Sequence, residues 1–596
     1  MATNLKALEL APNLEALSFF RICFGAYLLL QYVSFWPDYG AFYTDNGILP
    51  LATLAADHGI AGIGLMAPIL NGAARIGLPA TLPLLYPASL VAFILGYRTR
   101  WACALAFVFN VYLFWRNPYV TSGAEVLARL LLLWCLFLPL NRYWSIDAAL
   151  DPQDRRRPYP RWPFVALRLQ IASLYFFSAL FKLEGEPWRH GAGVAWALQD
   201  SLFGGSAPGL WLVQHAPAVV LVANYAVIAF QLSFPYLIYS PWRNDATRAV
   251  AIAGAATLHL SFIVLLNIGS FPYLCLTMLL LLVPDRWIDA ALARRRAKLA
   301  RIAIYYEPGC GFCRKVARLL REFVLAPETR VCDAAEDAEA LRLLRAHNSW
   351  VVADPEGQVH LKWRAVAYVL RQNPVTRPLG AISDLRPLRG VFEKLYDAIG
   401  RRRRGLGKLT GVVLAEHRES APPRLALGIN AALATLALLC NLISLVPSSA
   451  AQQPNREINR TNDVSVHSAL DDLFAVLQIR QYWALFAPVP THWHWQFDFA
   501  GSDAQGATVA LGGSVGLLAS DDAATRLRHG YWLKYLSHVS EFSAADWDAL
   551  DRYLCRAAPI ERVAIGVAAR AVDATPTDKP AFEQHREIAC SAAVAA

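Results

Sequence analysis

Long apolar runs separated by short polar loops dominate the first half of the chain. A membrane-spanning helix needs about 20 mainly apolar residues, and nine runs reach or approach that length. They are Leu14 to Ser34, Ala80 to Gly96, Trp101 to Trp115, Gly123 to Leu140, Phe164 to Leu183, Ala218 to Ser240, Ala249 to Leu266, Gly269 to Pro284 and Arg424 to Val446. The pattern predicts a polytopic α-helical membrane protein with about nine spans, three of them near the short limit.

An insert at residues 301–400 breaks this pattern. RIAIYY has the composition of a short strand, GCGFC that of a turn, and RKVARLLREFVL places apolar residues at helical spacing. WVVADPEGQVHLKW then predicts a hairpin that turns at Asp354 to Gly357, with a helix at Ala365 to Gln372. A strand, a CxxC turn and a helix in this order predict a thioredoxin-like α/β domain.

The last 145 residues, 452–596, form a second polar stretch. In THWHWQFDF, Trp493, Trp495, Phe497 and Phe499 alternate with His492, His494, Gln496 and Asp498, which predicts a strand with one apolar face. YWLKYLSHVSEF and DWDALDRYLCRA predict helices, so we expect a small α+β domain. His492 and His494 would share a face that can bind copper or zinc, but a solvated strand face is the favoured interpretation.

Composition supports membrane residence. The chain is 56% hydrophobic and only 17% charged, with a mean hydropathy of +0.32, which is too apolar for a soluble protein of this length. Its net charge of +10 is what basic cytoplasmic loops produce. We therefore expect a lipid bilayer as partner and no nucleic acid.

The basic residues also predict the orientation. With the N-terminus inside, the inside segments hold sixteen Lys and Arg residues and the outside loops three. This bias places the insert in the cytoplasm and the C-terminal domain outside. An oxidising exterior would allow Cys555 and Cys590, the only cysteines after residue 452, to pair; two free thiols are the alternative.

Cys310 and Cys313 are the candidate redox pair of the insert. Cys310 would lie at a helix N-terminus, where the helix dipole favours a thiolate, and Cys313 one turn further on could resolve a mixed disulfide. Two alternatives stay open: a structural CxxC, or half of a zinc site completed by Cys332, His347 or His360. A CxxC in the reducing cytosol would act as a reductant or sensor rather than as an oxidant of exported proteins.

Tyr306 to Cys313 resembles the Y-D-G-D-C-x-x-C signature of the DCC family of predicted thiol-disulfide oxidoreductases. The resemblance covers about a hundred residues and implies a thioredoxin-like fold with catalytic cysteines at Cys310 and Cys313. The chain departs from the signature at Glu307, Pro308 and Gly309, and lacks a proline before the Trp350 strand, where thioredoxins have their cis-proline.

Ionisable side chains inside predicted spans are costly, so each is a functional candidate. They are Arg21, Glu125, Arg129, Arg168 and Lys182, together with the polar His259, Gln231 and Asn110. Lys182 is near the outer end of its span, in LYFFSALFKLEGEPWRHG. An amine partly desolvated by aromatic neighbours can act as a base. The alternative is a lysine without a catalytic role whose side chain snorkels to the membrane interface.

The surrounding residues resemble the membrane domain of vitamin K-dependent gamma-carboxylase and its bacterial relatives, the horizontally transferred transmembrane (HTTM) family. The matching residues are Tyr175, Phe176, Lys182, Leu183, Trp188, Gly191, Arg21 and Tyr43 to Pro50. The resemblance covers residues 10–290 and implies that Lys182 is a base toward a vitamin K-like hydroquinone at the outer face. The chain has one more residue between the lysine and the tryptophan than the carboxylase.

Two hypotheses follow. The first is a redox enzyme of the bacterial inner membrane, with an HTTM domain at 1–290, a DCC domain at 301–400, a further span at 424–446 and an outer domain at 452–596. It would use Cys310 and Cys313 for thiol exchange and Lys182 for carboxylase- or epoxidase-like chemistry on a quinol. The second is a non-catalytic scaffold or maturation factor that binds a secreted protein or peptide.

Overall fold

The structure is a computed structural model of the 596-residue chain. It describes residues 13–56, 63–415, 428, 431–432, 435, 476–477, 483, 485–490, 493–511, 523–557, 560–571, 580 and 582–591. The predicted span Arg424 to Val446 therefore lies almost wholly outside the described residues, and so does His492.

Within the described residues, five helical segments are long and apolar enough to cross a membrane. They are Leu14–Tyr43, which comprises α2 (Leu14–Phe35), η1 (Trp36–Asp38) and α3 (Tyr39–Tyr43), and then α6 (Leu78–Leu95), α10 (Trp162–Glu184), α14 (Pro217–Tyr239) and α15 (Asn244–Leu265). These are five of the nine predicted spans. The helical class of the membrane part is thereby supported, whereas the count of nine stays a prediction.

The other predicted spans in the described residues are shorter or less apolar helices. Trp101 to Trp115 lies in α7 (Thr99–Arg116), whereas α8 (Gly123–Cys135) has only 13 residues. Gly269 to Pro284 contains α16 (Phe271–Met278) and η4 (Leu279–Leu282), a short apolar piece. Small helices complete this part: α4 (Leu51–Ala56), α5 (Ile63–Arg75), α9 (Ile146–Leu150), α11 (Glu186–Arg189), α12 (Gly193–Gln199) and α13 (Ala207–His215).

Arg21 ties three segments of the bundle together. Its guanidinium is fully buried and donates to the carbonyl oxygens of Leu140 (2.8 Å), Trp144 (2.5 Å) and Ile94 (3.3 Å). These carbonyls lie at the end of α6 and in the loop after α8, where a helix leaves carbonyls without intrahelical partners. Arg21 therefore has a structural role at this end of the bundle.

The Arg21→Leu variant should be strongly destabilised. Removing the guanidinium takes a donor from these carbonyl oxygens, which should cost about 1–3 kcal/mol for each one left unsatisfied. The measurement is thermal unfolding in detergent, compared with Arg100→Leu, which removes an exposed arginine of α7 and should change stability by less than about 0.5 kcal/mol. Equal melting temperatures for the two variants would contradict the structural role.

The insert has the predicted α/β fold. Its strands are β1 (Ala303–Tyr306), β2 (Arg330–Asp333), β3 (Val351–Ala353) and β4 (Val359–Leu361), in the order β2-β1-β3-β4. β1 is parallel to β2, and the other pairs are antiparallel. The helices are α18 (Gly311–Phe323), α19 (Ala338–His347), α20 (Lys362–Arg371), α21 (Arg377–Ile382) and α22 (Arg386–Val413). The strand, CxxC, helix and hairpin follow the predicted order.

The C-terminal part contains a four-stranded antiparallel sheet. β5 (Trp493–Ser502), β6 (Thr508–Ala510), β7 (Arg562–Ala571) and β8 (Phe582–Ala589) have the order β6-β5-β7-β8. Along β5, His494, Gln496 and Asp498 are exposed, while Trp495 and Phe497 between them are half-buried. Two helices accompany the sheet, α25 (Ala523–Leu536) and α26 (Ala544–Ala557), and a disulfide joins Cys555 to Cys590.

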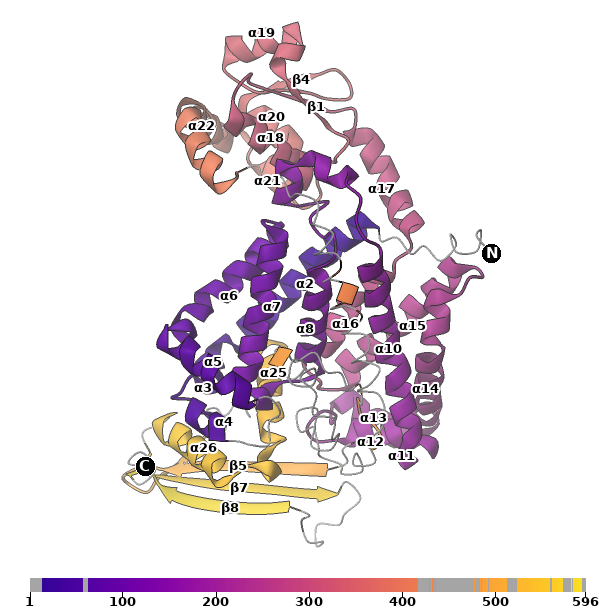
Figure 1. The fold of residues 1–596 in the computed structure, drawn as a ribbon, viewed down its shortest axis with the longest axis vertical. Helices are drawn as coiled ribbons and strands as arrows, with labels where there is room; N and C mark the ends of the chain where they lie inside the picture. Colours follow the sequence, from indigo (N-terminus) through magenta and orange to yellow (C-terminus); the bar gives the residue numbers. More distant parts are fainter. Residues whose placement is uncertain are drawn as a thin grey trace.

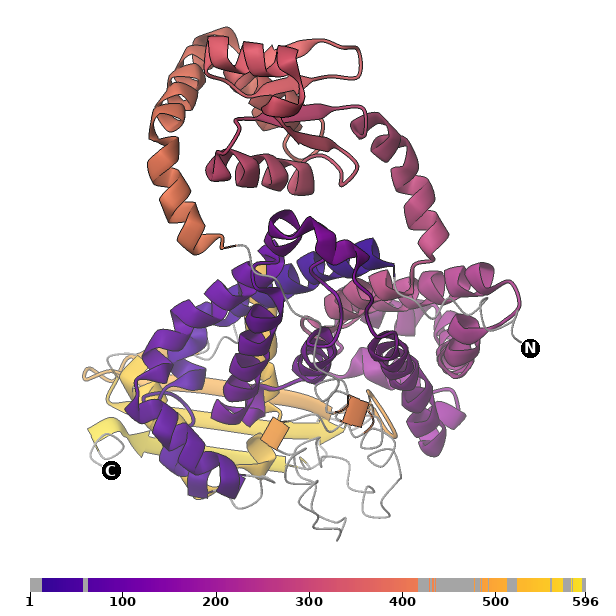
Figure 2. The same cartoon turned by 45° about the horizontal axis from the view of Figure 1, so that its top comes forward.

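The insert and the C-terminal sheet lie at opposite ends of the helical bundle (Figure 1). α17 (Asp285–Leu299) leads from the bundle to the insert, and α22 leads back (Figure 2). At the insert's end, the buried Glu322 of α18 accepts from the Trp144 amide (2.7 Å) and pairs with Arg155. At the other end, the ring of Trp532 in α25 packs 4.8 Å from that of Phe42. Both polar parts thus contact the bundle directly.

Candidate functional site

The dithiol lies at the start of α18, as the sequence predicts. Cys310 is the N-cap residue, and its Sγ accepts from the Cys313 amide (3.2 Å). Gly309 precedes it with φ of +72°, a conformation that glycine adopts without strain. A disulfide joins the two cysteines, with Cα atoms 5.3 Å apart. Cys310 is half-buried and Cys313 is buried, so Cys310 is the more accessible sulfur.

Charged residues from two elements surround this pair. An oxygen atom of the Glu307 carboxylate and the two cysteine sulfurs all lie within 4.8 Å of one another. Arg403 of α22 forms an ion pair with that carboxylate at 2.7 Å. Lys315 donates to the Thr410 carbonyl of α22 (2.8 Å). Desolvation, aided by the Asp333 carboxylate, raises the pKa of Tyr306, so its phenol stays neutral. α22 therefore packs on the dithiol end of α18, which sequence spacing did not indicate.

The zinc alternative finds no support in the described residues. In that part of the chain, Glu307, Cys310 and Cys313 are the one group of potential ligands whose atoms lie close enough together to hold a metal ion. His360 instead bonds Asp354 within the hairpin (3.0 Å), and Cys332 lies on β2 opposite Tyr305 of β1. A fourth ligand from Cys332, His347 or His360 is thus not assembled around the dithiol.

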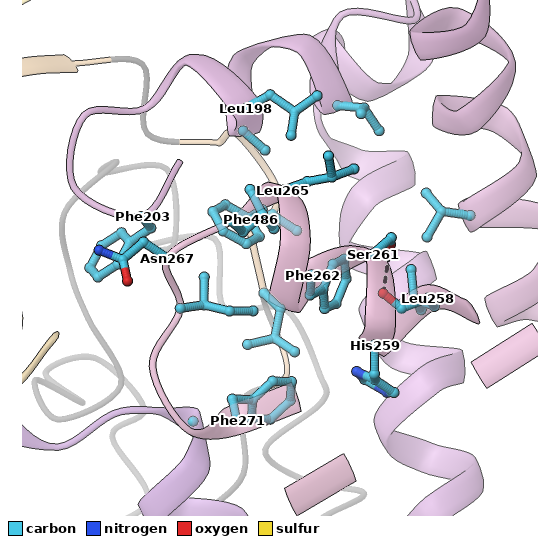
Figure 3. Close-up of a pocket in the computed structure, with 18 of the residues that line it drawn as sticks. Leu198, Phe203, Leu258, His259, Ser261, Phe262, Leu265, Asn267, Phe271 and Phe486 are labelled. Atoms are coloured by element: carbon cyan, nitrogen blue, oxygen red, sulfur yellow. Dashed lines mark hydrogen bonds between the residues drawn. The ribbon is translucent and has the colours of Figure 1, made fainter. Parts of the chain in front are cut away.

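A cavity of about 800 Å³ lies in the membrane part, and α25 of the C-terminal part also lines it. Helices α10, α14 and α15, the loop after α15, and the segment at 485–489 all contribute to its wall. Figure 3 shows His259, Phe262, Leu265, Phe271 and Phe486 around it. A mostly apolar wall and this volume are typical of pockets for small molecules and cofactors.

Lys182 lies in the wall of this cavity. Its side chain is buried, and Nζ donates to Ser178 Oγ (2.8 Å) and to the carbonyl oxygens of Leu485 (3.0 Å) and Ser178 (3.4 Å). Nζ also lies 5.0 Å from the Trp188 ring centroid, and the Trp188 indole donates to the Phe486 carbonyl (2.7 Å). The amine is thus held by neutral acceptors and an aromatic face, and it does not snorkel to an exposed surface.

Two further polar side chains of the wall have atoms without a hydrogen-bond partner. His259 Nε2 bonds the Tyr175 hydroxyl (2.7 Å), while its Nδ1 makes no hydrogen bond to the described part of the protein. The same holds for Gln231 Oε1. Both side chains are at least 95% buried and line the cavity. Buried polar atoms are normally satisfied by protein or by ordered water, so these two atoms are available to hydrogen-bond water or a ligand in the cavity.

Glu125 borders the same cavity as the N3 residue of a capping box on α8. Its carboxylate accepts from Ser122, from Gln31 Nε2 (2.6 Å) and from the Tyr531 hydroxyl (3.2 Å). With Arg129 it also borders a smaller second cavity, and the Arg129 guanidinium lies 4.6 Å from the Phe114 ring. Glu125 therefore links α8, α2 and α25 at the edge of the cavity.

The predicted membrane residues do not form one site. Lys182, Glu125 and His259 line the large cavity, whereas Arg21 bonds backbone at the other end of the bundle and Arg168 lies over the Phe164 ring (4.3 Å) without lining the cavity. Sequence reasoning missed the carbonyl of Leu485 and the side chains of Tyr531 and Lys534, which also line it. Nothing local signals these residues, because they are about 300 or more positions from Lys182.

Family models match two parts of the chain. The HTTM domain model matches residues 80–287, and the model of the DCC1-like thiol-disulfide oxidoreductase matches residues 304–409. No solved structure matches the chain. The first match contains Lys182 and His259, and the second contains Cys310 and Cys313. The chain thus joins an HTTM domain to a DCC1-like thiol-disulfide oxidoreductase domain, as its sequence motifs predict.

Proposed function

We propose that this membrane redox protein exchanges thiols and disulfides through Cys310 and Cys313, and uses Lys182 as a base toward a quinol. The thiol-disulfide exchange is supported by the geometry of the two cysteines. Cys310 is the more accessible and lies at the N-cap of α18, and Cys313 is buried one turn further on. Helix N-termini favour thiolates. The family match at 304–409 supports the same activity.

The exchange reaction runs in two displacements. The Cys310 thiolate attacks one sulfur of a substrate disulfide, forms a mixed disulfide and releases the other sulfur as a thiolate that takes up a proton. Cys313 then loses its proton and attacks Cys310 Sγ, which releases the second substrate thiol and leaves the Cys310 to Cys313 disulfide. The substrate gains two electrons and two protons, and the protein dithiol loses them.

The quinol part rests on the cavity around Lys182. A bound hydroquinone would supply an acidic hydroxyl and a reducing ring. Lys182 Nζ, in its neutral form, can accept the hydroxyl proton because Ser178 and the Leu485 carbonyl hold it in the wall. His259 Nδ1 and Gln231 Oε1 offer hydrogen bonds to polar groups of the same ligand, and the cavity volume of about 800 Å³ accommodates a quinone ring with part of a tail.

We place the dithiol domain in the cytoplasm and the C-terminal domain outside a bacterial inner membrane. The excess of basic residues in the predicted inner segments supports this orientation. The positions of the two domains at opposite ends of the bundle agree with it (Figure 1). In this arrangement Lys182 and the dithiol lie toward opposite faces, so they act on separate substrates.

The test is a redox titration of the full chain in lipid nanodiscs. Equilibration in glutathione buffers of graded potential, followed by alkylation and mass spectrometry of the CGFC peptide, should show a reversible two-electron transition between about −200 and −300 mV. A pair that stays fully oxidised across that range would instead identify a structural CxxC, because structural disulfides have potentials below about −300 mV.

A further inference from the structure

The last turns of α22 have two chemically different faces. One face packs on α18: Arg403 pairs with Glu307 (2.7 Å), the Thr410 carbonyl accepts from Lys315 (2.8 Å), and a Cβ at Gly407 would lie 3.9 Å from the nearest atom of Phe312. Positions 403, 407 and 410 are spaced by four and three, so they share one side of the helix.

The opposite face is exposed. Its last turns carry aliphatic side chains, and basic side chains precede them along the helix. Leu409, Val412 and Val413 are 60%, 78% and 50% exposed, and Arg401, Arg402 and Lys408 are exposed as well. Residues 400–415 contain five Lys and Arg residues and no Asp or Glu. A surface that combines bare aliphatic side chains with uncompensated positive charge is typical of helices that lie at a membrane interface.

The end of this helix lies against the membrane part of the chain. The Tyr97 hydroxyl, directly after α6, donates to the Val413 carbonyl (2.7 Å), and Figure 2 shows α22 descending from the insert to the bundle. At 1.5 Å per residue, Lys408 lies about 8 Å and Arg402 about 16 Å along the helix from Val413. The headgroup region beside the hydrocarbon core begins within that range.

We propose that residues 401–413 of α22 bind the anionic phospholipid surface of the membrane in which the chain resides. Leu409, Val412 and Val413 would enter the interface, and the basic side chains above them would meet phosphate groups. The charge of the exposed face favours lipid over a second copy, because two copies would bring Arg401, Arg402 and Lys408 of one chain against the same three residues of the other. The predicted span Arg424 to Val446 begins eleven residues after Val413 in the sequence.

This contact would position the dithiol. Because Arg403 and Thr410 of the same helix hold Glu307 and Lys315 beside the CxxC turn, lipid on the exposed face of α22 would keep Cys310 near the membrane surface. The second tether is the Glu322 contact at the far end of α18. Substrates of the dithiol would then approach along the membrane rather than from bulk cytosol.

The test places the photocrosslinker p-benzoylphenylalanine at position 412 of the full-length protein. The protein is reconstituted in nanodiscs of phosphatidylcholine with or without phosphatidylglycerol, and adducts are identified by mass spectrometry. We expect lipid adducts at position 412, with a yield about tenfold higher when the anionic lipid is present. Position 346 is the control, since Ala346 is exposed on α19, which lies at the outermost end of the insert (Figure 1), and it should give no lipid adduct.

A charge series separates lipid attraction from simple proximity. Arg401→Gln with Arg402→Gln should lower the yield at position 412 about tenfold in anionic discs. The matched pair Arg342→Gln with Arg345→Gln, on α19 at the outermost end of the insert (Figure 1), should leave it unchanged. Adducts between two chains, no adduct, or equal yields in both lipid mixtures would each overturn the proposal. None of these outcomes depends on redox activity.

Discussion

Cys310→Ser should abolish thiol-disulfide exchange by the full chain, with a loss of at least about a hundredfold in rate. Cys310 is the accessible sulfur of the pair, and its position at the N-cap of α18 favours the thiolate that attacks. The measurement is reduction of a fluorescent glutathione disulfide by protein in nanodiscs. Cys332→Ser is the matched control because it removes the other, half-buried cysteine of the same domain, and it should keep full activity.

Cys313→Ser should have a different outcome. Cys310 can still attack, but no second thiol resolves the product, so mixed disulfides should accumulate on Cys310 and appear on non-reducing gels. Full activity of Cys310→Ser, or absence of any trapped species with Cys313→Ser, would contradict catalysis by the pair and favour a structural role for the CxxC.

Lys182→Met should lower hydroquinone turnover by about 10²- to 10⁴-fold, the range that a positioned general base contributes. Methionine keeps an apolar side chain of similar length in the buried position, so the cavity should persist. Dissolved oxygen oxidises a hydroquinone through its anion, so a base that removes the hydroxyl proton speeds up the oxidation. The measurement is therefore the rate at which a naphthohydroquinone is consumed, after subtraction of the rate with empty nanodiscs.

Two variants of the same cavity serve as controls. Lys534→Met removes the second amine of the wall and should have an effect of less than about tenfold, because Lys534 belongs to α25 and is not in the matched HTTM segment. Ser178→Ala removes one of the three hydrogen bonds of Lys182 and should give an intermediate loss. Equal losses for Lys182→Met and Lys534→Met would point to general disruption of the cavity.

Local features of the fold could be predicted from the sequence because they depend on neighbouring residues. The strand, turn and helix around Cys310 occupy about twenty consecutive positions, and alternation along THWHWQFDF specifies the exposed and covered sides of β5. The number of spans could not be predicted in this way. Gly123 to Leu140 is mainly apolar, but its helix α8 ends at Cys135, since tertiary packing and not hydropathy decides where a buried helix ends.

The sequence by itself determined the class of the protein: a polytopic membrane domain with buried ionisable residues, and an inserted domain with a dithiol at a helix start. Composition, periodicity and a four-residue motif are local properties, so they can be recognised in the sequence alone. Only the tertiary structure decided which distant groups meet. In the structure, Lys182 donates to the Leu485 carbonyl, the Tyr531 hydroxyl donates to Glu125, and Arg403 forms an ion pair with Glu307. Such contacts depend on how helices and domains pack, and residues up to about 400 positions apart carry no shared pattern from which to predict them.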